Sequence, residues 1–307
     1  MRPAVPPHIL TGWLGIDAIQ QACASRFPTL TAAAPALLAQ ASPAGLAGAP
    51  TPNPILLYKA WHDVLGKYPD YPAQQIGDCV SFGHAHANDL LQCIEIALGE
   101  PAEYRETDTE FIYGASRQVA GILGSFDGSY GAAAVKAMTT IGMVSRQMLG
   151  DQGTYSGKRA KEWGRTGPPA AIEAEAAPYK LGSAALVSTW DELVASLKNG
   201  YPATICSNQG FTLHRDQDGF CAARGVWGHC MMIAGVRFDR EGACIVQSWG
   251  PDVPDGPLGL DQPTFSFWAD RRAIERILSA GDSWALSKAP EFVARPIPDH
   301  WGYDQAA

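Results

Sequence analysis

The pattern of apolar and polar positions predicts a helical first half of the chain. Residues 80–98 have helical composition without proline, and Gly99 follows where a helix would stop. This helix is expected to begin at Cys79. Further helices are predicted around 113–120 and over 131–140.

The second half is predicted to contain more strands. Thr189 and Glu192 have the spacing of a capping box and precede a helix expected over 190–198. A strand over 203–207 follows directly. The segments CMMIAGVRF and ACIVQSW flank the turn DREG, which predicts a β-hairpin from about 230 to 249.

Composition divides the chain into four segments. Residues 1–30 are predicted as an arm with one short amphipathic helix within 9–26, either packed on the protein or acting as an inhibitory pro-segment. Residues 31–54, rich in Ala and Pro, are predicted as a semi-extended linker or as an arm lying on an assembly partner. The main domain is expected over 55–290, followed by a tail over 291–307.

Bulk composition limits the classes of function. The 307 residues are 46% hydrophobic and suffice for one large core, while a net charge of −8 argues against a nucleic-acid partner. No signal peptide or long apolar run is recognised, so a cytoplasmic protein without membrane insertion is expected. Seven cysteines without a CxxC pair predict a reduced chain without zinc, and the absence of nucleotide-binding motifs implies no cofactor.

The candidate chemistry is a cysteine paired with a histidine. A thiol attacks a carbonyl as thiolate, and the amino end of a helix favours negative charge, so Cys79 is a candidate nucleophile. His229 immediately precedes the first hairpin strand and is the candidate base. Gln247 lies near the end of the second strand, and the interval between 229 and 247 is centred near the turn, so its amide is expected to orient the imidazole.

Three motifs resemble the papain family of cysteine peptidases. QQIGDCVSF resembles that family's nucleophile segment, GHCMMIAGVRF its histidine strand, and IVQSWG its Asn-Ser-Trp-Gly strand. His229 follows Cys79 by 150 residues, in the family's order and spacing. The segments FIYGASRQVAG, FDGSYGAAAVKAMTTIGMV and TWDELVASLKNGYPATICSNQGF extend the resemblance over roughly 55–290.

The resemblance implies a two-lobe α+β fold, with an N-terminal helical lobe carrying Cys79 and a C-terminal antiparallel β lobe carrying His229. It implies hydrolysis of a peptide or isopeptide bond in a peptide or protein substrate through a thioester. By the same resemblance Gln247 takes the orienting position. Gln74, or Gln75 as second choice, would donate its amide to the oxyanion.

The chain departs from the family pattern near both reactive groups. Gln replaces Asn at 247, Val80 replaces an aromatic residue, and Asp78 adds a carboxylate expected to oppose thiolate formation. The family's cysteine just upstream of the nucleophile is missing, so its disulfide is not expected here. His84 and His86, two apart on the predicted helix, are expected on its surface and not as metal ligands.

These departures leave two alternatives to a peptidase. The first is a weak or inactive papain-like module in a larger assembly that binds a partner through the N-terminal arm. By association, the uncharged Ala/Pro arm suits a phage or virion-associated protein. The second keeps the same residues and changes the reaction to that of a transferase or amidase.

Overall fold

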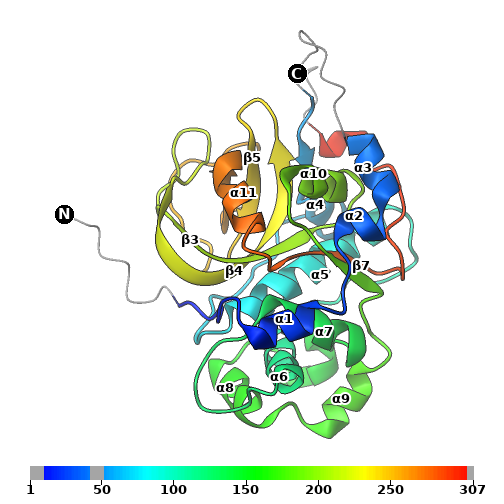
Figure 1. Cartoon of the computed structure of the whole chain (residues 1–307), viewed down its shortest axis with the longest axis vertical. Coiled ribbons are helices and arrows are strands. Elements are labelled where there is room, and N and C mark those ends of the chain that lie inside the picture. The colour runs from blue at the N-terminus through cyan, green and yellow to red at the C-terminus, as the bar shows by residue number, and fades with distance from the viewer. Residues whose placement is uncertain (1–9, 42–51, 303–307) are drawn as a thin grey trace, which may run out of the picture.

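The computed structural model describes residues 10–41 and 52–302. Figure 1 shows two lobes, with a sheet at the top left and a group of helices including α6, α7, α8 and α9 at the bottom. The long helix α5 (Cys79–Ala97) lies between them. This is the α+β arrangement expected from the sequence.

The helices and 3₁₀ segments follow the chain in a simple order. Besides α5 they are α1 (Ala18–Ala24), α2 (Leu30–Ala33), α3 (Pro35–Ala41), α4 (Lys59–Leu65), α6 (Thr109–Ala120), α7 (Gly131–Thr140), η1 (Arg146–Gln152), α8 (Gly157–Thr166), α9 (Ala170–Ala176), α10 (Trp190–Lys198), α11 (Arg271–Leu278) and η2 (Asp299–Trp301). None of these described helices is both long and apolar enough to cross a membrane.

The strands of the described residues form one antiparallel sheet. They are β1 (Ile55–Leu56), β2 (Ser183–Leu186), β3 (Ala203–Phe211), β4 (Ala223–Arg237), β5 (Gly242–Val246), β6 (Ser266–Asp270) and β7 (Ser283–Ser287). Their order is β2-β7-β3-β4-β5-β6, and β1 pairs with β4. β4 is therefore central, and Cys230 and Met231 in its middle lie against Gly83 of α5.

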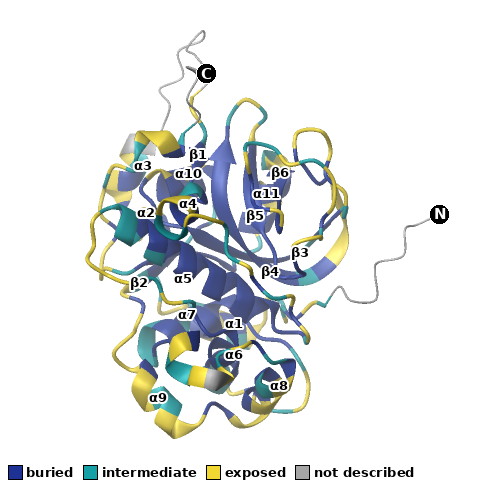
Figure 2. Cartoon of the chain, turned by 180° about the vertical axis from the view of Figure 1, so that it is seen from behind, coloured by how far each residue is buried: buried dark blue, intermediate teal, exposed yellow. Residues whose placement is uncertain are grey.

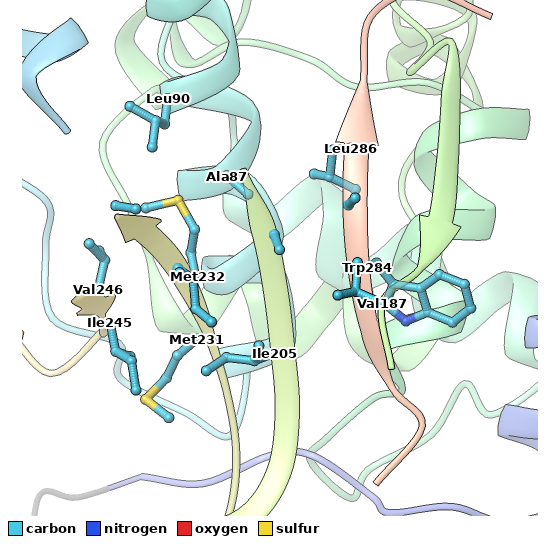
Figure 3. Close-up of a cluster of buried hydrophobic side chains, with 14 of the residues drawn as sticks. Ala87, Leu90, Val187, Ile205, Met231, Met232, Ile245, Val246, Trp284 and Leu286 are labelled. Atoms are coloured by element: carbon cyan, nitrogen blue, oxygen red, sulfur yellow. The ribbon is translucent and has the colours of Figure 1, made fainter. Parts of the chain in front are cut away.

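The core holds α5 against this sheet. Figure 2 shows α5 and the adjoining strands buried, while α9 and many loops are exposed. In Figure 3, Ala87 and Leu90 of α5 lie near Met232 of β4 and Leu286 of β7. All four side chains are completely buried. Burial of apolar area on this scale fixes the amino end of α5 relative to β4.

Several predicted elements are confirmed. The helices over 131–140 and 190–198 have the predicted limits, and α5 begins at Cys79 as expected. In the capping box of α10, Thr189 Oγ1 accepts a hydrogen bond from Glu192 N at 3.2 Å. The side chain of Glu192 in turn accepts from Thr189 N. Local signals sufficed where capping and periodicity agreed.

The N-terminal segment differs from the predicted arm and linker. Of the described residues within 9–26, only Ala18–Ala24 is helical, because Asp17 caps the helix there and Gly15 before it has a φ of 92°. Residues 31–41 are mainly helical, and Leu30 and Leu37 are fully buried. Alanine and leucine favour helix, and these two leucines supply a buried face that an extended linker would lack. Residues 42–51 of the predicted linker, like 1–9 and 303–307, lie outside the described residues.

Two further expectations need correction. His84 and His86 are buried instead of lying on the helix surface, because α5 is covered on nearly every side. His84 Nδ1 is 2.7 Å from Val80 O, and His86 stacks on Tyr71. The expected fully reduced chain also differs from the structure, in which Cys206 and Cys230 form a disulfide. They are paired residues on neighbouring strands β3 and β4, a placement that residue spacing along the chain did not reveal.

Replacing Leu37 by Ala tests whether the segment before residue 55 belongs to the fold. We expect a loss of roughly 2–5 kcal/mol in the free energy of unfolding, the usual cost of truncating a fully buried leucine. Urea denaturation measures it, with Leu38→Ala as the matched control because Leu38 is only partly buried. Equal stability of Leu37→Ala and the unchanged chain would show that this segment acts as a linker.

Candidate active site

Cys79 is the first residue of α5 and is completely buried. The free N–H groups of a helix's first turn point toward this position and stabilise negative charge. Asp78 precedes it as the N-cap residue without making a side-chain capping bond. The sequence prediction for the position of Cys79 at a helix start therefore agrees with the structure.

His229 lies on β4, one residue before Cys230. The imidazole is completely buried, and it stacks on the Trp249 indole with ring centres 4.3 Å apart. Neither Nδ1 nor Nε2 has a hydrogen-bond partner among the described residues. Each buried polar atom without a partner costs about 1–3 kcal/mol of stability. Packing alone therefore does not favour a buried His229 imidazole.

The segment 10–14 covers this site. It is part of the longer N-terminal segment predicted over 1–30, and from here on the name 'arm' refers to 10–14 alone. Gly12 N and Trp13 N both donate to Gly228 O, at 2.9 and 3.0 Å, immediately before His229. On the other side, Ser129 N donates to Gly12 O at 2.8 Å, and Leu14 N donates to Ser129 O at 3.1 Å. Gly228 belongs to β4, and Ser129 immediately precedes Tyr130, the N-cap residue of α7. The arm therefore joins the two lobes by backbone hydrogen bonds.

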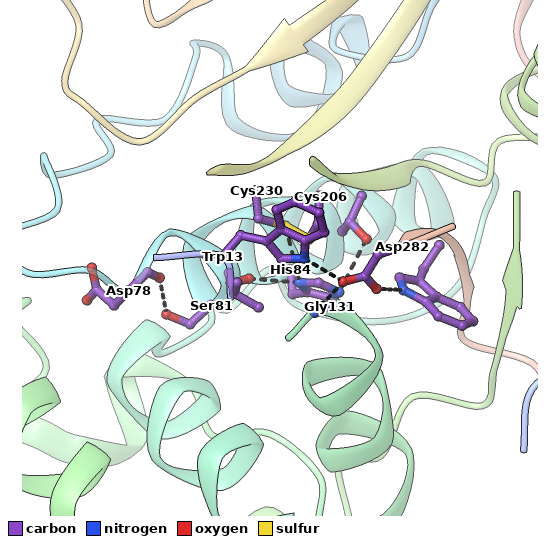
Figure 4. The surroundings of a disulfide bond; sticks show 11 residues. Trp13, Asp78, Ser81, His84, Gly131, Cys206, Cys230 and Asp282 are labelled. Atoms are coloured by element: carbon purple, nitrogen blue, oxygen red, sulfur yellow. Dashed lines mark hydrogen bonds between the residues drawn. A yellow bond between two sulfur atoms is a disulfide. The ribbon is translucent and has the colours of Figure 1, made fainter. Parts of the chain in front are cut away.

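Side chains fix both ends of the arm. Trp249 Nε1 donates to Leu10 O at 2.9 Å, and Trp13 Nε1 donates to Asp282 Oδ2 at 2.8 Å. Figure 4 shows Trp13 reaching Asp282 beside the Cys206–Cys230 disulfide. Asp282 also accepts from Gly131 N and is completely buried, and its burial raises the pKa of that carboxyl.

The backbone of the arm passes so close to the backbone at Gly77 that position 12 must be a glycine. A Cβ at Gly12 would lie 2.0 Å from Gly77 O, and a Cβ at Gly77 would lie 2.7 Å from Thr11 O. Neither position has room for a side chain, because backbone meets backbone. The arm therefore passes directly over the turn that leads into Cys79.

The closed arrangement favours the uncharged forms of both reactive groups. Burial raises the pKa of Cys79 to about 12, with a smaller contribution from Asp78, while backbone N–H groups of Cys230, Gly12 and Trp13 oppose the rise. Burial also lowers the pKa of His229 to about 3. Thiol and neutral imidazole thus predominate near pH 7 with the arm in place.

Burial limits the negative charge that was expected at Asp78 from the sequence. Its carboxyl is completely buried, and Tyr155 Oη donates to Oδ2 at 2.8 Å. Burial raises the pKa of Asp78 well above its usual range, so the protonated form is favoured. Tyr155 Oη also accepts from Gln75 N at 2.8 Å, which ties the segment before Cys79 to the segment before α8.

Gln247 contacts the loop after β5 instead of His229. Its Nε2 donates to Gly250 O at 3.0 Å and to Val253 O, and its Oε1 accepts from Trp249 N. The hairpin pairs Met232 with Val246 after a register shift, so continuing this pairing places 249 opposite 229. The sequence prediction centred the hairpin at 238, whereas Arg237 pairs with Gly242, so its centre lies between 239 and 240.

Of the two glutamines proposed as oxyanion donors, Gln74 is the buried one. Its Oε1 accepts from Ser248 Oγ at 2.5 Å, and its Nε2 donates to Ile76 O at 2.8 Å. Gln75 is exposed, and its Oε1 accepts from Gly157 N at 3.1 Å. The structure therefore brings Gln74 to the strand end near Trp249, and Gln75 to the start of α8.

Sequence reasoning missed the residues that hold the arm. Trp13 and Asp282 carried no recognised motif, and Gly228 begins GHCMMIAGVRF without having been assigned a role, because these contacts join distant segments. Ser129 lies within FDGSYG, a segment that had been singled out without a role for this residue. Among the described residues, no group of three or more His, Cys, Asp or Glu side chains is placed to hold a metal ion.

Comparison with solved structures places this geometry in a known fold. Xylellain, a cysteine protease from Xylella fastidiosa, aligns with 91% of this chain and 96% of its own, with a TM-score of 0.64 and 16% identity. Procathepsin B S9 from Trypanosoma congolense aligns with 91% of this chain and 86% of its own, at TM-score 0.54 and 11% identity.

The chain has a papain-like fold. In this papain-like protein, the arm crosses between the start of α5 and β4 at Gly228. The ragweed pollen cysteine protease Amb a 11, in its proform, gives a TM-score of 0.50 at 16% identity, covering 80% of this chain and 68% of its own. No family model matches the sequence, and no curated protein matches it.

Alkylation by iodoacetamide tests the environment of Cys79. In the folded chain at pH 8 we expect Cys79 to react at least about 100-fold more slowly than in the denatured chain, because the raised pKa leaves little thiolate. The rate should keep rising with pH above 9. Mass spectrometry of the Cys79 peptide measures it, and Cys93, buried near the other end of α5, is the internal control. A plateau below pH 8 would contradict the buried, protonated thiol.

Proposed function

We propose that this protein is a cysteine peptidase whose site is closed by its own arm. Cys79 is the nucleophile and His229 the general base, and the bond hydrolysed is a peptide or isopeptide bond. The observation that carries the proposal is the arm's backbone lying over Cys79, with two N–H groups on Gly228 O beside His229. A polypeptide backbone therefore already occupies the position where a peptide substrate would pair.

The orphaned imidazole supports a reactive role for His229. Two buried ring nitrogens without partners are costly, and such costs persist where a group must remain available for chemistry. Once the arm leaves, solvent and substrate reach the thiol and imidazole. Their pKa values then move toward their ordinary ranges, which restores proton exchange between them near neutral pH.

The reaction balances with these two groups and one water. His229 takes the thiol proton as the Cys79 sulfur attacks the carbonyl carbon, and it returns that proton to the leaving amine as the C–N bond breaks. Water then attacks the thioester, losing a proton to His229, and the acid departs as the sulfur regains a proton. N–H groups at the start of α5 and the nearby Gln74 amide are proposed to stabilise the oxyanion.

Gln247 is proposed to orient His229 indirectly. Its amide binds the backbone at Trp249, Gly250 and Val253, which fixes the loop carrying the Trp249 ring. That ring stacks on the imidazole and restricts its rotation. Gln247 is thus a positioning residue in this proposal, in place of the direct hydrogen bond expected from the sequence.

A side chain at position 12 is expected to open the site. In Gly12→Leu, the new Cβ meets the Gly77 carbonyl, so the arm cannot dock and kcat/KM for a peptide substrate should rise at least about tenfold. Release of a fluorophore from a mixed peptide library measures the change. Ala22→Leu is the control, because it introduces the same side chain at an exposed position of α1. Equal rates for the two variants would refute closure by the arm.

Removal of either reactive group in the Gly12→Leu background tests the assigned chemistry. Cys79→Ala and His229→Ala are each expected to lower kcat at least about 1,000-fold, since the two groups act as a unit. Both variants are checked for folding by circular dichroism. Hydrolysis that survives in folded Cys79→Ala would exclude the proposed nucleophile. A folded Gly12→Leu protein that is inactive and unreactive toward thiol-directed electrophiles would favour the inactive binding module.

The finer expectations about partners stay predictions. Two predictions rest on the composition of residues 31–54 alone. They are an assembly partner for the predicted N-terminal segment before residue 55 and an association with a virion. The described part of that segment packs on the protein itself, as Leu37 in α3 shows.

A further inference from the structure

A cavity of about 680 Å³ lies along α5, beyond the turn that carries Cys79. Its α5 wall is formed by Asn88, Gln92, Glu95 and Ile96, whose spacing places them on one face of the helix. At 1.5 Å per residue, Asn88 stands roughly 14 Å along the helix from Cys79. The volume falls within the range of about 300–1,000 Å³ that small-molecule sites occupy.

The remaining walls are partly apolar and come from distant segments. They are formed by Glu100, Ala102, Glu103, Arg105, Thr107, Met143, Val144, Ser145, Met148, Tyr179 and Lys288. Met143, Val144 and Ser145 are buried, whereas Glu100, Glu103 and Arg105 are exposed. The cavity therefore has a buried inner part and a charged rim.

Lys288 supplies an ammonium group without a paired carboxylate. Its Nζ donates to Asn88 Oδ1 at 2.7 Å, and no ion pair involves it among the described residues. The neighbouring Glu95 is committed to Arg295, whose Nη1 lies 2.7 Å from both of its carboxylate oxygens. An ammonium carries three donors, so Lys288 has capacity left for an anion.

The charge of Lys288 is costly in the empty cavity. Burial lowers the pKa of Lys288 to about 8, even though Asp89 and Glu95 act in the opposite direction. Asp89 is itself buried, which raises its pKa to about 7, and it accepts from Thr107 Oγ1 and Tyr71 Oη. An anion placed against Nζ would offset the cost of burying this ammonium.

Ser145 provides a second donor to the same cavity. Its residue is more than nine-tenths buried, and its Oγ donates a hydrogen bond to none of the described residues. A buried hydroxyl left unsatisfied is unfavourable by about 1–3 kcal/mol. Ser145 and Lys288 come from different segments and line the same cavity.

We propose that this cavity binds a monocarboxylic acid with an apolar body. The carboxylate pairs with Lys288 Nζ and accepts a hydrogen bond from Ser145 Oγ, while the apolar body packs against Met143, Val144 and Met148. Glu100 and Glu103 at the rim repel ligands of higher negative charge and so disfavour phosphate esters. This site is separate from the proposed peptidase site and does not depend on it.

Calorimetric titration of the intact chain with octanoate, octan-1-ol and acetate tests the proposal. Octanoate is expected to bind at least tenfold more tightly than either comparison compound, because it alone has both the charge and the chain. Lys288→Met keeps the apolar stem and should weaken octanoate at least tenfold without changing octanol binding. Lys158→Met, at an exposed position of α8, is the matched control and should bind octanoate like the unchanged chain.

Ser145→Ala keeps the test decisive if Lys288→Met does not fold. Because Ser145 Oγ donates to none of the described residues, the free variant should be at least as thermally stable as the unchanged chain, yet bind octanoate several-fold more weakly. Equal affinity of octanoate and octanol, no detectable octanoate binding, or undiminished binding by a folded Lys288→Met would each overturn the proposal. Octanoate is expected to leave the rate of Cys79 alkylation unchanged. A slower alkylation of Cys79 with octanoate present would place the acid at the peptidase site instead and overturn the proposal.

Discussion

The backbone of the arm, hydrogen-bonded to Gly228 on one lobe and Ser129 on the other, determines the state of the site. These bonds occupy polar backbone groups of β4 and of the segment before α7 that would otherwise lie open at the lobe boundary. They also bring Gly12 against Gly77, where a side chain at either position would meet backbone. The closed site is therefore a property of backbone geometry more than of any one side chain.

Burial accounts for the electrostatics of Cys79 and His229, and the arm forms part of the cover over them. A thiol with a pKa near 12 and an imidazole with a pKa near 3 do not exchange a proton at neutral pH. Removing the low-dielectric cover changes both values in the direction that permits exchange. Asp78 adds little charge of its own, because its buried carboxyl favours the protonated form. In the proposed function, the same contacts keep the site inactive while the arm is docked, and its release permits reaction.

The sequence predicted what local signals determine. A proline-free helix beginning at Cys79, the Thr189 capping box and the order of Cys79 and His229 all follow from short segments, and the papain-like fold was expected from three motifs. It did not predict the contacts of Gln247, because the hairpin is centred later along the chain than the sequence suggested, which changes the residue opposite His229. It also missed the Trp13–Asp282 contact and the Cys206–Cys230 disulfide, which join segments distant along the chain.

Detection of an acyl-enzyme tests the central claim most directly. A chain with the arm displaced is mixed with a slowly hydrolysed peptide thioester, quenched in acid, and analysed by mass spectrometry after digestion. The account predicts a hydroxylamine-sensitive acyl mass on the Cys79 peptide, and far less of it in the intact chain. A folded, arm-displaced protein that carries no acyl group at Cys79, or carries it on another cysteine, would contradict the account.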